Sequence, residues 1–249
     1  MALHFLVDAA DGDGIDHAAA GEILALTGAE AHHAAVVRRV RVGEEVTVGD
    51  GRGMWLTGVV EEVAPKRVAV RVGARRDVPA AAPRLMLVQA LAKGDRDELA
   101  IQAATELGVD EIVPWQASRS VSRWDPAKAV KGVARWQGIV REAAKQAHRA
   151  WVPTVGDPVS TKQLAARPGA RLLVLEPTAS AALSTLEVDG ADTRDLVLVV
   201  GPEGGIAPEE LDALAAAGAS LVRLGDTVLR TSTAGPAALA VLNATLGRW

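Results

Sequence analysis

Cysteine is missing from all 249 residues of the sequence. Its absence excludes disulfide bonds and cysteine-ligated zinc sites. It also excludes any mechanism in which a thiolate of this chain attacks a substrate. The five histidines include no pair at helical spacing, so the sequence predicts no metal site.

Long apolar runs are missing as well. No stretch approaches the roughly 18 consecutive apolar residues that a membrane-spanning helix needs. The first residues, MALHFLVDAADGDG, lack the basic start and the apolar run of a secretory signal peptide. We therefore expect a cytoplasmic protein without a membrane partner.

Aromatic side chains are scarce, with one Phe and no Tyr, although 49% of the residues are hydrophobic. The apolar residues are mostly Ala, Val and Leu, which suit helices packed on a parallel sheet. The net charge of −4 is not typical of a nucleic-acid-binding protein, but residues 119–151 contain eight Lys or Arg against two acids. This basic segment is either a solvated helix face or a surface for a polyanion.

Two parts of the chain differ in pattern. Residues 1–75 are rich in alternating Val, and GDGRG at 49–53 supplies a hairpin turn, which predicts a small β-barrel with a short helix near 29–39. Residues 76–83 contain two prolines and are interpreted as a linker. In residues 84–249, apolar strand runs alternate with helical patterns, which predicts a parallel sheet.

The most distinctive segment is LVLVVGPEGGIAPEEL, residues 196–211. A buried strand leads into GPEGG at 201–205 and then into a helix that begins at Pro208 with acids in its first turn. Ligands of open α/β sheets bind at such carboxyl ends of strands, and glycines let the backbone approach them closely. The spacing fits neither a dinucleotide fingerprint nor a phosphate-binding loop. An ordinary tight turn is the alternative.

Two further strand ends carry unusual residues. LEP at 175–177 ends one predicted strand, and LGDTVLRTSTA at 224–234 follows another. The hydroxyls of Thr231, Ser232 and Thr233 are suited to cap the final helix, whereas such a cap has no need of the preceding arginine. Because parallel strands end at one edge of a sheet, we expect these segments and the GPEGG loop to converge on one pocket.

The order and spacing of these motifs resemble SPOUT-class methyltransferases and, within that class, the 16S ribosomal RNA uridine-N3 methyltransferase family. GPEGG is followed after about 19 residues by LGDTVLRTSTA. Three more segments resemble the family's catalytic domain: KGDRDELAIQAATELGVDEIVP (93–114), RSVSRW (119–124) and REAAKQAHRAWVP (141–153). HHAAVVRRVRVGEEVTVGDG (32–51) resembles the family's PUA-like RNA-binding domain. The resemblance covers nearly the whole chain.

This resemblance implies an α/β fold in which a SPOUT-type parallel sheet carries a C-terminal trefoil knot, joined to an N-terminal PUA-like β-barrel. It implies a homodimer that binds S-adenosyl-L-methionine and methylates N3 of a uridine in 16S RNA or in the small ribosomal subunit. A nitrogen acceptor agrees with the missing cysteine, because methylation of a pyrimidine ring carbon usually begins with attack by a thiolate. The cofactor-binding residues it implies are Leu175, Glu176, Gly201, Glu203, Gly204, Gly205, Leu224, Gly225, Leu229, Thr231 and Thr233.

RNA contacts are expected from both parts of the chain. The residues indicated by the resemblance and the basic segment are His33, Arg38, Arg39, Arg119, Arg123 and Arg149. Arg141, Lys145 and Arg149 recur every fourth residue, so we expect them to form one basic stripe along a helix.

Arg230 is the catalytic candidate. Loss of the uridine N3 proton leaves an anion that spreads over the neighbouring carbonyl oxygens, and a nearby cation stabilises that charge. Ser232 stands where the family often has Glu, so no catalytic carboxylate is expected there, and Ala103 stands where the family often has Lys. Two other functions stay open: SPOUT methylation of a ribose 2′-oxygen, and RNA binding without catalysis by a ribosome-assembly factor.

Overall fold

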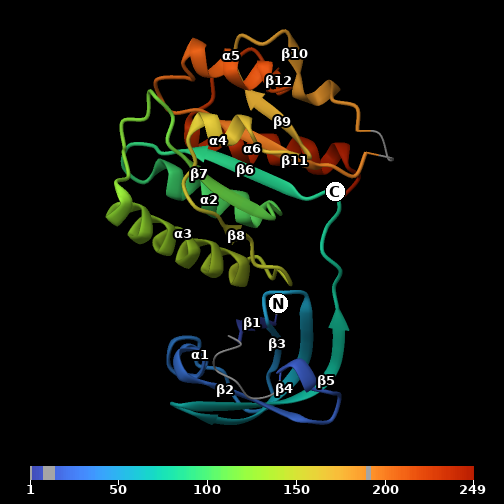
Figure 1. Ribbon diagram of the computed structural model, residues 1–249. Coiled ribbons are helices and arrows are strands. Elements are labelled where there is room, and N and C mark those ends of the chain that lie inside the picture. Colours follow the sequence, from blue (N-terminus) through green and yellow to red (C-terminus); the bar gives the residue numbers. More distant parts are fainter. Residues whose placement is uncertain (1, 8–14, 189–191) are drawn as a thin grey trace. The chain divides into compact units, whose positions relative to one another are not determined.

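The computed structural model describes residues 2–7, 15–188 and 192–249. The chain divides into two compact units (Figure 1). The first unit comprises residues 1–80 and 144–152, and the second comprises residues 81–143 and 153–249. The predicted domains assigned the short segment 144–152 to the second part of the chain, whereas this segment packs within the first unit.

The first unit is built on a five-stranded sheet with the order β1-β3-β4-β5-β2. The strands are β1 (Leu3–Leu6), β2 (Ile23–Thr27), β3 (Glu45–Gly49), β4 (Met54–Ala64) and β5 (Arg67–Asp77). β1 pairs with β3 in parallel, and the other pairs are antiparallel. The predicted hairpin turn joins β3 to β4, where Gly51 and Gly53 adopt positive φ angles of 70° and 107°.

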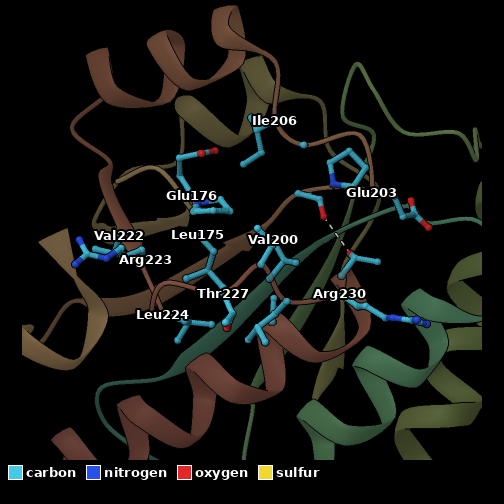
Figure 2. Close-up of a pocket in the computed structure, with 18 of the residues that line it drawn as sticks. Leu175, Glu176, Val200, Glu203, Ile206, Val222, Arg223, Leu224, Thr227 and Arg230 are labelled. Atoms are coloured by element: carbon cyan, nitrogen blue, oxygen red, sulfur yellow. Dashed lines mark hydrogen bonds between the residues drawn. The ribbon is translucent and has the colours of Figure 1, made fainter. Parts of the chain in front are cut away.

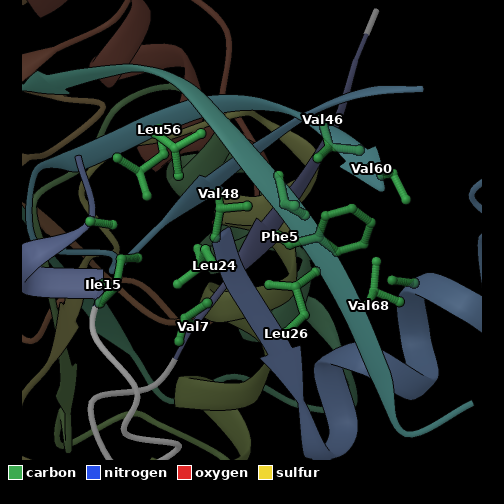
Figure 3. Packing of buried hydrophobic residues seen from close by; sticks show 14 of the residues in the cluster. Phe5, Val7, Ile15, Leu24, Leu26, Val46, Val48, Leu56, Val60 and Val68 are labelled. Atoms are coloured by element: carbon green, nitrogen blue, oxygen red, sulfur yellow. The ribbon is translucent and has the colours of Figure 1, made fainter. Parts of the chain in front are cut away.

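Alternate side chains of these strands form the core of the first unit. Val68, Val70 and Val72 of β5 are all at most 2% exposed and belong to one core cluster, in which Figure 3 shows Val68 beside Phe5 and Leu26. The register of β4 against β5 shifts between Thr57 and Gly58, and an added Cβ on Gly58 would lie 2.5 Å from the Arg71 carbonyl oxygen. The period of two in the Val-rich sequence therefore corresponds to one buried face of a curved sheet.

The short helix predicted near 29–39 consists of two pieces. Helix α1 (Gly28–His32) continues into a π-helical turn, η3 (His33–Val37). Arg39 follows with a φ of 55°, an uncommon angle for a residue with a side chain. A 3₁₀ turn, η2 (Ile15–His17), completes the helical segments described in this unit.

The second unit is a seven-stranded, wholly parallel sheet with the order β10-β12-β9-β11-β6-β7-β8. Its strands are β6 (Leu85–Ala90), β7 (Glu111–Trp115), β8 (Thr154–Val155), β9 (Ala170–Leu175), β10 (Ala181–Ala182), β11 (Asp195–Val200) and β12 (Ser220–Arg223). Its helices are α2 (Arg96–Glu106), α3 (Pro126–Gln146, whose last turn packs in the first unit), α4 (Thr161–Ala165), η4 (Leu183–Thr185), α5 (Pro208–Ala216) and α6 (Thr231–Thr245). The predicted parallel sheet is confirmed.

Helices cover both faces of this sheet, which is why its central strands β6 and β11 are mostly apolar and buried along nearly their whole length. Met86 and Val88 of β6 belong to a core cluster with Leu164 of α4 and Leu214 of α5. On the opposite face, Leu87 approaches Gly235 of α6, where an added Cβ would lie 3.1 Å from it. Helix α2 packs beside α6 (Figure 1).

Helix α6 begins earlier than the sequence suggested. Arg230 occupies the N-cap position with extended backbone, and Thr231 is the first helical residue. The expected hydroxyl cap is wrong, because no side chain caps this helix; the Thr233 hydroxyl instead donates to the Arg230 carbonyl. None of the helices in the described part of the chain has the length and apolar character needed to span a lipid bilayer.

A buried histidine distinguishes the sheet of the first unit. The His4 ring stacks on Trp55 with ring centroids 4.3 Å apart, and its Nδ1 lies 2.9 Å from the Thr47 hydroxyl. Burial first, and then the nearby His148 and Lys145, lower the pKa of His4 to about 3. The folded protein therefore holds this ring neutral.

We expect the His4→Phe variant to resist acid better than the unsubstituted protein. In the unfolded chain a histidine binds a proton near pH 6.5, whereas in the folded chain His4 does so only near pH 3. Stability is thus fully present above pH 6.5 and falls below it, by about 1.4 kcal/mol per pH unit. Urea unfolding at pH 7 and pH 5 should show a loss smaller by roughly 2 kcal/mol in the variant. Equal losses in both proteins would contradict this, and His17→Gln is the exposed-histidine control.

Candidate functional site

A cavity of about 320 Å³ lies in the second unit, where strands β9, β11 and β12 end (Figure 2). Three loops line it: residues 175–177 after β9, residues 200–206 after β11, and residues 222–231 after β12. Arg96 at the start of α2 and Ala234 of α6 complete the lining. The three strand ends that the sequence singled out therefore converge, as predicted.

Most of the predicted cofactor residues line this single cavity. Those present are Leu175, Glu176, Gly201, Glu203, Gly205, Leu224, Gly225, Leu229 and Thr231, and the catalytic candidate Arg230 joins them. Gly204 and Thr233 are outside it: Gly204 faces the loop that carries Arg119, and Thr233 is exposed on α6. Sequence reasoning missed Arg96 and Ile206, which have no glycine-rich signal of their own.

Gly201 determines the path of the loop after β11. The chain folds back so closely that a Cβ on Gly201 would lie 2.6 Å from Ile206 Cγ1. Gly205 then turns the chain with a φ of 72°, and its N–H donates to the Pro202 carbonyl at 2.9 Å. Glycine is thus needed for close approach at one position and for a left-handed backbone at the other.

Glu203 anchors one wall of the cavity. Its Oε1 accepts hydrogen bonds from the Lys93 backbone N–H at 3.1 Å and from the Arg96 guanidinium at 2.9 Å. Burial raises the pKa of Glu203, but hydrogen bonds from its own backbone N–H, from Lys93 and from Arg96 outweigh it, so the pKa ends below its ordinary value. Glu203 thus fixes Arg96 at the cavity instead of offering a free carboxylate.

The cavity combines an apolar part with an available cation. Leu175, Val200, Ile206, Val222 and Leu224 supply apolar side chains (Figure 2). The Arg230 side chain is exposed and, within the described part of the chain, has no hydrogen-bond or ion-pair partner. Such a site suits a ligand with a flat apolar ring and leaves positive charge for an anion beside it.

A second loop packs against the glycine-rich one. The Arg119 guanidinium donates to the Gly204 carbonyl at 3.2 Å, and Arg123 donates to the Ser118 carbonyl at 2.8 Å. The loop is held by buried Glu210, whose carboxylate accepts from the Ser118 N–H and hydroxyl and from Thr161. Burial raises the pKa of Glu210, but these hydrogen bonds together lower it below its ordinary value.

The predicted basic stripe along α3 is wrong. The helix ends at Gln146, so Arg149 lies beyond it. Lys145 is buried, and its Nζ lies 3.0 Å from Glu30 Oε1. A lysine that neutralises a buried carboxylate is not available to a polyanion.

The other basic candidates of the first unit lie around its π-helical turn. Arg38 and Arg39 are exposed, and His33 is partly buried with its ring centroid 6.3 Å from that of Phe5. Trp124 packs on Gly132 and lies edge-on to Trp136, so its ring is engaged in packing within the second unit. No group of three or more potential metal ligands occurs among the described residues.

Comparison with known proteins gives consistent matches. A family model described as an RNA methyltransferase domain matches residues 80–243, and one described as an RNA methyltransferase PUA domain matches residues 26–73. The chain is 46% identical to ribosomal RNA small subunit methyltransferase E of Mycobacterium bovis, covering 92% of this chain and 89% of that protein. It is 31% identical to the Bacillus subtilis protein of the same name, covering 88% of each.

A solved structure agrees with these matches. The ribosomal RNA small subunit methyltransferase E of Neisseria gonorrhoeae, bound to S-adenosyl methionine, superimposes with a TM-score of 0.83 at 26% identity, covering 98% of each chain. That protein therefore shares both units of the present fold.

Two glycines of the cavity should respond differently to alanine. In Gly201→Ala the new Cβ collides with Ile206, so we expect both a lower melting temperature and weaker binding of S-adenosylmethionine. In Gly225→Ala no protein atom lies within 4 Å of the new Cβ, so any loss of affinity would come from collision with the ligand itself. Calorimetric titration and thermal melts separate the two.

Gly138→Ala, on an open face of α3, is the control and should change neither quantity for the worse. A Gly201→Ala protein with unchanged melting temperature and affinity would show that the loop tolerates a different path.

Proposed function

This chain belongs to the family of ribosomal RNA small subunit methyltransferases E, and from that premise we propose that it transfers the methyl group of S-adenosylmethionine to N3 of a uridine in small-subunit ribosomal RNA. Its α/β fold with a wholly parallel sheet and a PUA domain agrees with the SPOUT-type fold that the resemblance implied, and the knotted C-terminal part is carried over from that resemblance. The enzyme works in the cytoplasm, where its RNA substrate is made.

The converging cavity is the observation that carries this proposal. Its apolar part, with Leu175, Val222 and Leu224, suits the adenine ring of S-adenosylmethionine, and the glycine-rich loop brings backbone close to the ligand. The cofactor supplies an electrophilic methyl group on a sulfonium. The protein supplies position: it holds that methyl group in line with the acceptor nitrogen.

We assign Arg230 the role of contacting the uracil ring of the target uridine, which accepts the methyl group. Transfer needs the N3 proton to leave, and the remaining charge is shared with the carbonyl oxygens of the uracil ring. The Arg230 guanidinium, at the rim of the cofactor cavity, has no partner among the described residues and is available to donate to one of those oxygens. Ser232, on the first turn of α6, has no carboxylate to offer as a base.

Basic loops recruit the RNA. Arg119 and Arg123 lie on the loop that packs against Gly204, next to the cavity, and we expect them to contact phosphates near the target base. His33, Arg38 and Arg39 of the PUA domain, together with Arg149, contribute further contacts to the same polyanion. Net charge alone obscured this function, because acids elsewhere in the chain outweigh these arginines.

A homodimer completes the site. Val228 and Leu229 line the cavity yet are 79% and 39% exposed, and Trp249 at the C-terminus is 66% exposed. Apolar residues exposed at the rim of a ligand site suit coverage by a second subunit.

Both alternative functions are less well supported. The loop after β12 keeps the LRT-x-TA pattern of the family that methylates uridine N3, and the cavity has space for a cofactor.

The decisive experiment is methyl transfer to small ribosomal subunits with labelled S-adenosylmethionine, followed by mass-spectrometric mapping of the RNA. We expect one N3-methyluridine, present in RNA from cells that contain the protein and missing after deletion of its gene. Label in a ribose would instead support 2′-oxygen methylation. Cofactor binding with no transfer to intact subunits or free RNA would support an assembly factor.

Arg230→Gln should lower kcat by roughly 100-fold, as expected for loss of one donor to a developing oxyanion, with little change in affinity for S-adenosylmethionine. The deficit should shrink as pH rises, because the imide proton then leaves without assistance. Single-turnover rates between pH 7 and pH 10 test this. Arg194→Gln, a surface arginine paired with Asp192, is the control, and full turnover by Arg230→Gln would remove the residue from the mechanism.

A further inference from the structure

A fully buried glutamine near the end of strand β6 forms a hydrogen bond with the first residue of helix α6. Gln89, near the end of β6, is 0% exposed and does not line the cavity. Its Nε2 donates to the Thr231 hydroxyl oxygen at 2.9 Å and to the Ala90 carbonyl at 3.2 Å. The Thr231 hydroxyl in turn donates to the Gly201 carbonyl at 3.0 Å, the bond drawn in Figure 2.

The direction of this chain of hydrogen bonds is fixed. The Ala90 carbonyl only accepts, so the amide nitrogen of Gln89, and not its oxygen, must face it. The same nitrogen then donates to Thr231, whose single hydroxyl proton is left to point at Gly201. The side chain of Thr231 is therefore a link in the protein and not a donor to the cofactor, although it was expected among the cofactor-binding residues.

Gln89 is retained at a cost. Among the described residues its Oε1 is one of three buried side-chain atoms without a hydrogen-bond partner. Leucine or methionine at this position would avoid leaving a buried carbonyl oxygen unpaired. Stability of the sheet alone does not explain a glutamine here, so the two bonds that it donates must serve another purpose.

These hydrogen bonds connect two segments that line the cavity, the loop after β11 and the start of α6. Gly201 opens the glycine-rich loop, and because Pro202 follows, the peptide that joins them has a carbonyl but no N–H with which to orient itself. Thr231 is the first residue of α6 and follows directly on Arg230. One buried amide thus fixes the loop that forms the cofactor wall and the helix start that carries the arginine.

We propose that Gln89 is a positioning residue that acts through Thr231 to hold the Gly201 carbonyl and the Arg230 backbone in register. The part of the inference that concerns Arg230 rests on the proposed function, whereas the part that concerns the cofactor wall does not. Gln89 touches neither cofactor nor substrate.

Gln89→Leu and Thr231→Val keep the volume of each side chain and remove the linkage. Each should weaken S-adenosylmethionine binding roughly tenfold and lower kcat roughly tenfold. Because both variants break one linkage, the double variant should be no worse than either single variant. Thr231→Ser keeps the hydroxyl and should behave like the unsubstituted protein.

Asn243→Leu is the matched control. Asn243 is also a buried amide on the same face of the sheet, in α6 itself, and donates to the Leu107 and Leu239 carbonyls, but it lies near the far end of the helix. Its loss should lower the melting temperature and leave affinity and kcat near normal. Calorimetry, thermal melts and single-turnover rates on the same preparations provide the comparison.

Three results would overturn the inference: normal affinity and rate in Gln89→Leu, multiplied effects in the double variant, or an equal loss of affinity in Asn243→Leu. A different result would count against the proposed function. If the unsubstituted protein transfers no methyl group while the Gln89 and Thr231 variants still lose affinity together, the linkage stands and the assigned reaction fails.

Discussion

The cavity depends on the reversal of the chain directly after β11. Ile206 folds back over Gly201 at a distance that excludes any side chain there, and this fold-back separates the cofactor wall from the strand end. The loops after β9 and β12 then need only continue the direction of their strands to close the other sides, because parallel neighbours end at one edge. The missing Cβ of Gly201 thus lets Ile206 pack against the end of β11, where both residues line the cavity.

The charge that the site presents depends on which of its ionised side chains are bound to other groups of the protein. Glu203 binds Arg96 and the Lys93 N–H, so its negative charge is neutralised within the wall. Arg223 is likewise engaged by the carbonyls of Ala179 and Ser180. Arg230 alone among these three arginines has no partner in the described structure. The site therefore presents one cation without a partner in the described structure beside a largely apolar surface.

Sequence patterns correctly predicted the strands and helix starts that depend mainly on neighbouring residues. The Val alternation of β5, the apolar run 85–88 that begins β6, and Pro208 with its acidic first turn each specify an element with little help from distant residues, and each was predicted correctly. The convergence of three loops followed from parallel topology alone. The family assignment required the order of the motifs, because GPEGG by itself fits an ordinary turn.

The failures came where distant residues decide. Lys145 looked like part of a basic stripe, but Glu30, 115 residues away, buries it in an ion pair. The sequence predicted that the hydroxyls at the start of α6 cap the helix. Instead, the Thr231 hydroxyl accepts a hydrogen bond from Gln89, which lies 142 residues away in the sequence. Arg96 lies in the segment 93–114 that resembles the family but was not singled out there, and its bond to Glu203 shows its place in the wall. Single-sequence reasoning has no access to such partners.

The short segment 144–152 determines where the first unit can be separated from the rest of the chain. Trp151 lies over Gly53, where a Cβ would approach its ring to 2.8 Å, and its indole N–H donates to the Val78 carbonyl at 2.9 Å. The polypeptide consequently crosses between the units at 80/81, 143/144 and 152/153. A fragment of residues 1–80 would thus leave out Trp151, although its contacts with Gly53 and Val78 belong to the first unit.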